Sequence, residues 1–253
     1  MSAEVKKEIQ LEIAHVLFVD IVGYSKLSIN EQNAAVDELT QIVRCTEQFQ
    51  KAEASQRLIK ISTGDGLALV FYTSPEAPVR CAVEVSRSVK DHPRLNLRMG
   101  IHSGPVSGVT DVTGRTNLAG AGLNVAQRIM NCGDAGHILL SKHVTEDLEE
   151  YDEWRPLLHD LGECEVKHGA RISVSNLCSE EIGNPAVPEK LMAARAAAVA
   201  QRKQAAFRWL SLSVLGLFAA IAVIAFLFVR YAPRFASTAL AVPEKSIAVL
   251  PFE

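Results

Sequence analysis

The 253-residue chain lacks the markers of several protein classes. Its formal net charge is only −3, so it has no basic excess of the kind that nucleic-acid-binding proteins carry. Its five cysteines form no C-x-x-C pair, which argues against zinc and a disulfide framework and favours buried thiols in a reducing compartment. Residues 1–12 are charged and contain no apolar core of a secretory signal. We expect a chain that starts in the cytosol and binds no nucleic acid.

Motifs of other enzyme classes are also missing. The chain has no H-E-x-x-H sequence, and its seven histidines show no zinc spacing. Gly114, Gly120 and Gly122 form neither a dinucleotide-binding fingerprint nor a P-loop. His102 follows an apolar run and precedes Ser-Gly-Pro, so we expect it to support a turn rather than to act as a base. These absences direct attention to carboxylates and glycine turns.

Hydrophobic residues make up 48% of the chain, enough for one ordinary globular core. The periodicity of residues 13–178 predicts a strand, a helix, two strands, a helix, a strand, a helix, a short strand, a helix and two further strands. That order indicates a mixed α+β fold with helices packed on one face of a sheet. The pattern predicts one helical stretch over 30–54 with Asn30 as its N-cap, and a strand over 95–102. Residues 1–12 are expected to be an N-terminal arm.

The C-terminal part has a different composition. Residues 209–229 contain no ionisable side chain and are long enough, as a helix, to cross about 30 Å of hydrocarbon, so we predict one transmembrane helix. Basic residues are more frequent before this run than after it, which predicts a cytoplasmic domain and a single-pass protein of the inner (plasma) membrane. We expect a linker helix over 179–208, acting either as a signal transmitter or as an inert spacer. Residues 230–253 would be an extracytoplasmic tail or the start of a further domain.

Two aspartates follow apolar strand-like runs and lie next to glycine turns. Asp20 stands in FVDIVG, residues 18–23, and Asp65 stands in TGDG, residues 63–66. A carboxylate at the mouth of a strand is held firmly yet stays accessible, and glycine lets backbone N–H groups approach a phosphate. If the two aspartates converge, they form a site for a pair of divalent metal ions. Taken singly, each would be an ordinary turn residue.

Several motifs, taken in order, resemble those of the class III nucleotidyl cyclase catalytic domain, the adenylate and guanylate cyclase homology domain. They are FVDIVGYS at 18–25, TGD at 63–65, GIHSGP at 100–105, LNVAQR at 123–128 and VKHG at 166–169. The resemblance covers residues 13–178 and implies a ferredoxin-like cyclase sheet domain. It also implies conversion of ATP to 3′,5′-cyclic AMP and pyrophosphate for intracellular signalling.

The resemblance assigns roles to individual residues. Asn124 and Arg128 share one helix face because they lie four residues apart. By resemblance, Asn124 orients the ribose and Arg128 stabilises charge on the α-phosphoryl group. The implied ligands of two divalent cations, Mg²⁺ or Mn²⁺, are Asp20, the Ile21 carbonyl and Asp65, and the implied phosphate-binding residues are Gly23, Tyr24, Ser25 and Lys167. In this family the aspartates and the Asn/Arg helix of one site come from different chains, so a homodimer is expected.

The base-reading positions depart from the family pattern. Ile61 stands where adenylate cyclases usually have lysine and guanylate cyclases have glutamate. Lys60 is one residue earlier and points to the opposite face of a strand unless a bulge intervenes. Thr63 shares the face of Ile61, and Asn117 takes the second base-reading position with an amide that can both donate and accept. We favour ATP over GTP, with a guanylate cyclase or a noncatalytic nucleotide-binding module as the alternatives.

Overall fold

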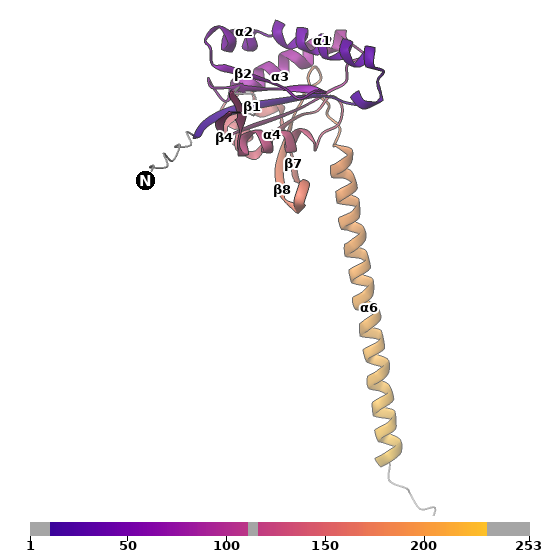
Figure 1. The fold of residues 1–253 in the computed structure, drawn as a ribbon. Helices are drawn as coiled ribbons and strands as arrows, with labels where there is room; N and C mark the ends of the chain where they lie inside the picture. The colour runs from indigo at the N-terminus through magenta and orange to yellow at the C-terminus, as the bar shows by residue number, and fades with distance from the viewer. Residues whose placement is uncertain (1–10, 111–115, 232–253) are drawn as a thin grey trace, which may run out of the picture. The chain divides into compact units, whose positions relative to one another are not determined.

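The central strand β1, Leu11–Ile21, organises the fold. The structure is a computed structural model that describes residues 11–110 and 116–231, except for the side chains of residues 109–110, 116–117, 168, 203, 205–219 and 229 (Figure 1). The chain forms two units, 1–197 and 198–253. In the first unit, β1 alternates between two buried layers, with Leu17 and Val19 on one face of the sheet and Val16 and Phe18 on the other.

The strands form one mixed eight-stranded sheet in the order β2-β3-β1-β4-β6-β8-β7, with β5 paired to β4. The β4–β6 pair is parallel, and the other pairs are antiparallel. The remaining strands are β2 Leu58–Ser62, β3 Gly66–Phe71, β4 Leu97–Thr110, β5 Thr116–Ala119, β6 Ile138–Ser141, β7 Leu158–Glu165 and β8 Arg171–Leu177.

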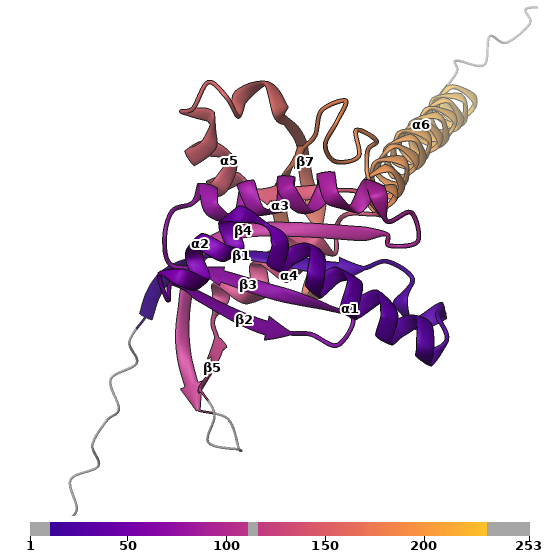
Figure 2. The same ribbon diagram turned by 90° about the horizontal axis from the view of Figure 1, so that it is seen from above.

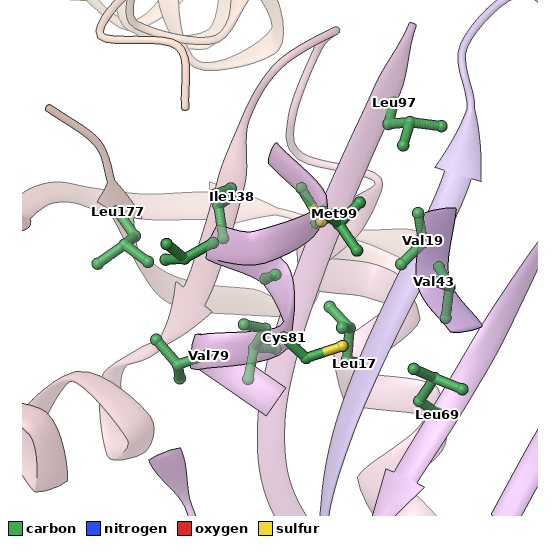
Figure 3. Close-up of a cluster of buried hydrophobic side chains, with 14 of the residues drawn as sticks. Leu17, Val19, Val43, Leu69, Val79, Cys81, Leu97, Met99, Ile138 and Leu177 are labelled. Atoms are coloured by element: carbon green, nitrogen blue, oxygen red, sulfur yellow. The ribbon is translucent and has the colours of Figure 1, made fainter. Parts of the chain in front are cut away.

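Helices cover both faces of this sheet. Those that pack on the Leu17 face include α1 Ile29–Cys45, α2 Glu47–Ala54, α3 Glu76–Ser88 and α5 Lys142–Glu149. Figure 2 shows α1, α2 and α3 lying over the strands. In this layer Leu17 and Val19 meet Val43 of α1 and Cys81 of α3 (Figure 3). On the other face, α4, Ala121–Met130, packs against Val16 and Phe18. The predicted α+β fold is therefore confirmed, but helices cover both faces of the sheet rather than the one face expected.

Three local predictions are wrong. The stretch 30–54 is two helices rather than one, because Thr46 adopts an extended conformation and its hydroxyl caps α2 by accepting from the Phe49 N–H. Helix α1 begins earlier than expected, with Ser28 as its N-cap and Glu31 completing a capping box. Strand β4 does not end at His102, because its pairing with β1 continues as far as Ser107 opposite Leu11.

His102 consequently supports no turn. Its Nδ1 lies 2.9 Å from the Ser141 hydroxyl, where β6 ends and α5 begins. Burial, together with the nearby His143, lowers the pKa of His102 to about 4, so the imidazole is neutral near neutral pH. His102 therefore tethers two strands as a neutral hydrogen-bonding group.

One long helix, α6, Glu189–Tyr231, contains most of the predicted linker and the whole of the predicted transmembrane stretch. A search of the described residues finds no helix that is both long and apolar enough to span a membrane. The transmembrane prediction for 209–229 thus gains no support, and the membrane location that rests on it stays a prediction. Residues 1–10 of the predicted N-terminal arm and residues 232–253 of the predicted tail lie outside the described residues.

The cysteine prediction is wrong for one pair. Cys132, directly after α4, and Cys164, in β7, are buried and joined in a disulfide across a sequence separation of 32 residues. Cys45, Cys81 and Cys178 are free. No sequence motif marks the pair, because only tertiary packing brings the C-terminal end of α4 and strand β7 together.

We expect an alkylating reagent to label three thiols in the denatured, unreduced chain and five after reduction. Because the crosslink closes a long loop, reducing it should lower the free energy of unfolding by about 3 kcal/mol. Thiol counting by mass spectrometry and denaturant unfolding with and without reductant measure both effects. A Cys132→Ala/Cys164→Ala variant should not respond to reductant, and five labelled thiols without reduction would contradict the disulfide.

Candidate active site

Asp20 and Asp65 converge at one end of the sheet. Asp20 is near the end of β1, is only 6% exposed, and stands opposite Gly66 in the β1–β3 register. The Ile21 N–H donates to the Asp65 carbonyl oxygen at 3.0 Å, so the tip of the β2–β3 hairpin is bound to the end of β1. The hairpin therefore brings Asp65 close to Asp20, as predicted.

Gly66 permits this approach. A Cβ atom added at Gly66 would lie 2.1 Å from the Val19 carbonyl oxygen, far inside contact distance. Gly64, in the same hairpin, has a φ of +93°, a left-handed conformation that favours glycine, but it has open space around it. The hairpin therefore needs one glycine for space and one for backbone conformation.

Arg98 on β4 completes the carboxylate cluster, and sequence reasoning missed it. Its guanidinium donates to the Asp20 carboxylate, with Nε 2.8 Å and Nη2 2.6 Å from Oδ2. Burial raises the pKa of the Asp20 carboxyl above its ordinary value, while Arg98 opposes that shift and Asp65 adds to it. No local motif marks Arg98. It meets Asp20 because the two residues lie directly opposite each other in the β1–β4 ladder.

The chemistry of this cluster suits hard divalent cations. Two neighbouring carboxylates and the adjoining Ile21 carbonyl provide oxygen donors, and oxygen is the ligand that Mg²⁺ prefers. Within the described ranges, no group of three or more His, Cys, Asp or Glu side chains is arranged to hold a metal. Any metal here would therefore take its remaining ligands from backbone, water or substrate phosphate.

The predicted phosphate-binding turn follows Asp20. Gly23 has a φ of +80° and is the N-cap of a short 3₁₀ helix, Tyr24–Lys26. The first N–H groups of such a helix, those of Tyr24 and Ser25, have no acceptor inside it and can bind an anion. The turn lies directly beside Asp20, as the motif at 18–25 predicts.

A second cluster forms on α4 and after β7. Helix α4 lies close against β4, because a Cβ at Gly100 would fall 2.4 Å from the Met130 nitrogen. Asn124 and Arg128 line a cavity of about 430 Å³ together with Lys167. The other lining residues are Gln127, Asn131, Val166 and Lys190. The structure thus gathers Asn124, Arg128 and Lys167 in one cavity, whereas neither aspartate lines it.

The residues predicted to contact the base do not form one cluster. The Lys60 ammonium pairs with Glu53 at 2.6 Å and lies 5.7 Å from the centroid of the Phe49 ring, on the α2 side of the sheet. Ile61 instead packs with the layer that faces α4, so a base contact by Lys60 is not supported. The Thr63 N–H closes the hairpin turn by donating to the Gly66 carbonyl. Asn117 of β5 pairs with Val109 of β4, and the Asn117 side chain lies outside the described part of the structure.

Comparison with known proteins identifies the fold. The family model described as the adenylate and guanylate cyclase catalytic domain matches residues 6–177. The crystal structure of the adenylyl cyclase CyaB from P. aeruginosa is 18% identical, with a TM-score of 0.56, and the match covers 70% of this chain and 100% of that one. At this identity the likeness shows a shared fold.

Two further solved structures match in the same way. The guanylate cyclase domain of RhGC from Catenaria anguillulae, in complex with GTP, is 21% identical with a TM-score of 0.54, covering 67% of this chain and 98% of that one. An adenylate/guanylate cyclase/hydrolase from Silicibacter pomeroyi is 24% identical with a TM-score of 0.52, covering 68% and 99%. A search of curated proteins finds no match.

We expect Gly66→Ala to destabilise the protein by about 3 kcal/mol, because the added methyl group must push β1 and the hairpin apart. Denaturant unfolding measures the loss. Gly64→Ala is the matched control in the same hairpin, with an expected cost of about 1 kcal/mol from its left-handed backbone alone. Wild-type stability in Gly66→Ala would contradict the close approach that joins the two aspartates.

Proposed function

This chain belongs to the adenylate and guanylate cyclase catalytic domain family, and we propose that it converts ATP to 3′,5′-cyclic AMP and pyrophosphate at sites shared between two copies of the chain. The observation that carries the proposal is the separation of two complementary clusters. Asp20 and Asp65 meet at the hairpin, while Asn124, Arg128 and Lys167 line a cavity to which neither aspartate contributes.

The carboxylate cluster has the composition of a cation site. Asp20, Asp65 and the Ile21 carbonyl would hold two divalent cations, Mg²⁺ or Mn²⁺. When bound, such cations favour loss of the ribose 3′-hydroxyl proton and neutralise the triphosphate. Burial already raises the pKa of Asp20, so its charged form depends on a nearby cation. Arg98 supplies one positive charge to that carboxylate.

The second cluster has the composition of an anion and sugar site. Asn124 can hold a ribose oxygen, because an amide both donates and accepts. Arg128 offers a rigid guanidinium fork for the charge that develops on the α-phosphoryl group as the 3′-oxygen attacks and pyrophosphate leaves. Lys167, on the turn after β7, lines the same cavity and would bind the distal phosphates.

Neither cluster performs the reaction alone. Attack of the 3′-oxygen on the α-phosphorus needs activation of the hydroxyl and stabilisation of the phosphoryl charge at the same atoms. Two copies related by a twofold axis would present each cluster to the other, giving two equivalent composite sites. The homodimer is therefore part of the proposal.

The choice of adenine over guanine is part of the proposal and rests on what Ile61 lacks. Guanine presents N–H donors that need an acceptor such as a carboxylate. Ile61, at the family's base-reading position, is aliphatic and packs with the apolar α4 layer. It offers guanine no acceptor, so we propose ATP as the substrate, with GTP as the alternative outcome of the assay.

The test is to incubate the purified full chain with ATP or GTP and Mg²⁺ or Mn²⁺ and to quantify each cyclic product. We expect cyclic AMP, and we expect Asp65→Asn and Arg128→Ala to lower its rate by at least about 100-fold, as loss of metal or oxyanion contacts does. Asp37→Asn on α1 and Arg87→Ala on α3 are matched controls on exposed helix positions and should keep wild-type rates.

Cyclic GMP as the main product would overturn the choice of ATP and leave the cyclase activity intact. A confirmed dimer that forms neither product would overturn the activity itself. So would wild-type rates in both Asp65→Asn and Arg128→Ala.

A further inference from the structure

The first turn of α6 is fixed against the sheet domain. Leu191 is only 2% exposed and packs with Ile129 of α4 and Cys164 of β7. The Glu189 N–H donates to the Asp134 carboxylate at 2.8 Å, and Arg195 donates to the Leu161 carbonyl at 2.7 Å. Three separate contacts therefore hold residues 189–195 beside α4 and β7.

Residues 184–186, which precede α6, are also hydrogen-bonded to the sheet domain. The His137 imidazole lies 2.8 Å from the Ala186 carbonyl oxygen. Asn184 donates through its side chain to the Ala135 carbonyl at 3.0 Å, and its own carbonyl accepts from the Asn176 side chain at 2.7 Å. The position of the first turn of α6 is thus set by the sheet domain from both directions.

Lys190, on this turn, lines the cavity of about 430 Å³ that also holds Arg128 and Lys167. No carboxylate is among the residues that line it. Across the described residues, neither Lys190 nor Arg128 takes part in an ion pair. Three cationic side chains, with no carboxylate in the lining, make the cavity positively charged, which attracts a ligand with several negative charges.

We propose that Lys190 is a further substrate-binding residue, which with Lys167 binds the distal phosphates of the nucleoside triphosphate and the pyrophosphate that leaves. This inference rests on the proposed function, because that function places a triphosphate in this cavity. Arg128 is committed to the α-phosphoryl group, which leaves the two lysines for the β- and γ-phosphates. A compact ammonium on a flexible stem suits oxygens that depart as product.

The role predicts effects on binding rather than on the chemical step. The γ-phosphate makes and breaks no bond when the α-phosphorus–oxygen bond to pyrophosphate is cleaved, so a Lys190 contact with it stabilises the bound substrate and the transition state alike. Removing such a contact raises KM and leaves kcat nearly unchanged. It also weakens binding of free pyrophosphate, which is a readout that needs no turnover.

The test compares the full chain with its Lys190→Ala and Lys190→Arg variants. In Lys190→Ala we expect KM and the dissociation constant of pyrophosphate, measured by calorimetry, each to rise about three- to tenfold, as loss of one exposed charged hydrogen bond implies. Lys190→Arg should stay near wild type. Met192→Ala on the same helix and Lys142→Ala on α5 remove exposed side chains outside the cavity and should change neither quantity.

A double-mutant cycle tests whether the docked turn positions Lys190. Asp134→Ala removes the acceptor of the Glu189 N–H and should raise KM in the wild-type background. In the Lys190→Ala background it should add little, because the residue that it positions is gone. Full additivity would overturn the positioning of Lys190 by this contact.

The outcomes separate this inference from the proposed function. An active chain whose KM and pyrophosphate affinity do not change in Lys190→Ala would overturn the inference alone. A fall in kcat with unchanged KM would also overturn it. If the wild type forms no cyclic nucleotide but binds pyrophosphate in a Lys190-dependent way, the proposed function fails and the phosphate site stands.

Discussion

The register of β1 between β3 and β4 is the constraint on which the rest of the site depends. It sets Asp20 opposite Gly66 on one side and Arg98 on the other. A shift of one residue would turn Asp20 to the opposite face of the sheet and move the hairpin that carries Asp65. The absence of a side chain at Gly66 lets this register form, and Arg98 compensates the buried charge that results.

The same sheet also fixes the second cluster. Helix α4 can lie against β4 because Gly100 leaves room for it, and this contact directs Arg128 into the cavity. The Cys132–Cys164 disulfide then joins the end of α4 to the strand that leads to Lys167. Lys190 lines the same cavity from the first turn of α6, which packs beside α4 and β7. The two clusters are therefore parts of one rigid sheet domain, and the proposal requires a second copy to bring them together.

The candidate-site residues that stand within continuous sequence motifs could be predicted from the sequence. Asp20, Asp65, Asn124 and Arg128 stand in runs whose local pattern already defines a strand end, a glycine turn and a helix face. What could not be predicted depends on pairing across the fold. Arg98 and Asp20 are partners only through strand register, and Cys132 and Cys164 are separated by 32 residues.

Local signals also misled where longer-range pairing or capping decided the structure. The Ser-Gly-Pro run after His102 is typical of a turn, yet β1 pairs with β4 through it. Thr46 divides a continuous helical pattern by capping the second helix. Lys190 lies beyond the boundary expected at residue 178, so its approach to Arg128 follows only from the docking of α6.

The most direct test of the account is complementation between two inactive chains. Asp20→Ala and Arg128→Ala chains, carrying different tags, are co-expressed and the heterodimer is isolated by sequential affinity steps. The account predicts that each variant homodimer is inactive, and that the heterodimer recovers roughly half of the wild-type rate, because one of its two composite sites is intact. A purified heterodimer that stays as inactive as the two homodimers would contradict the shared site.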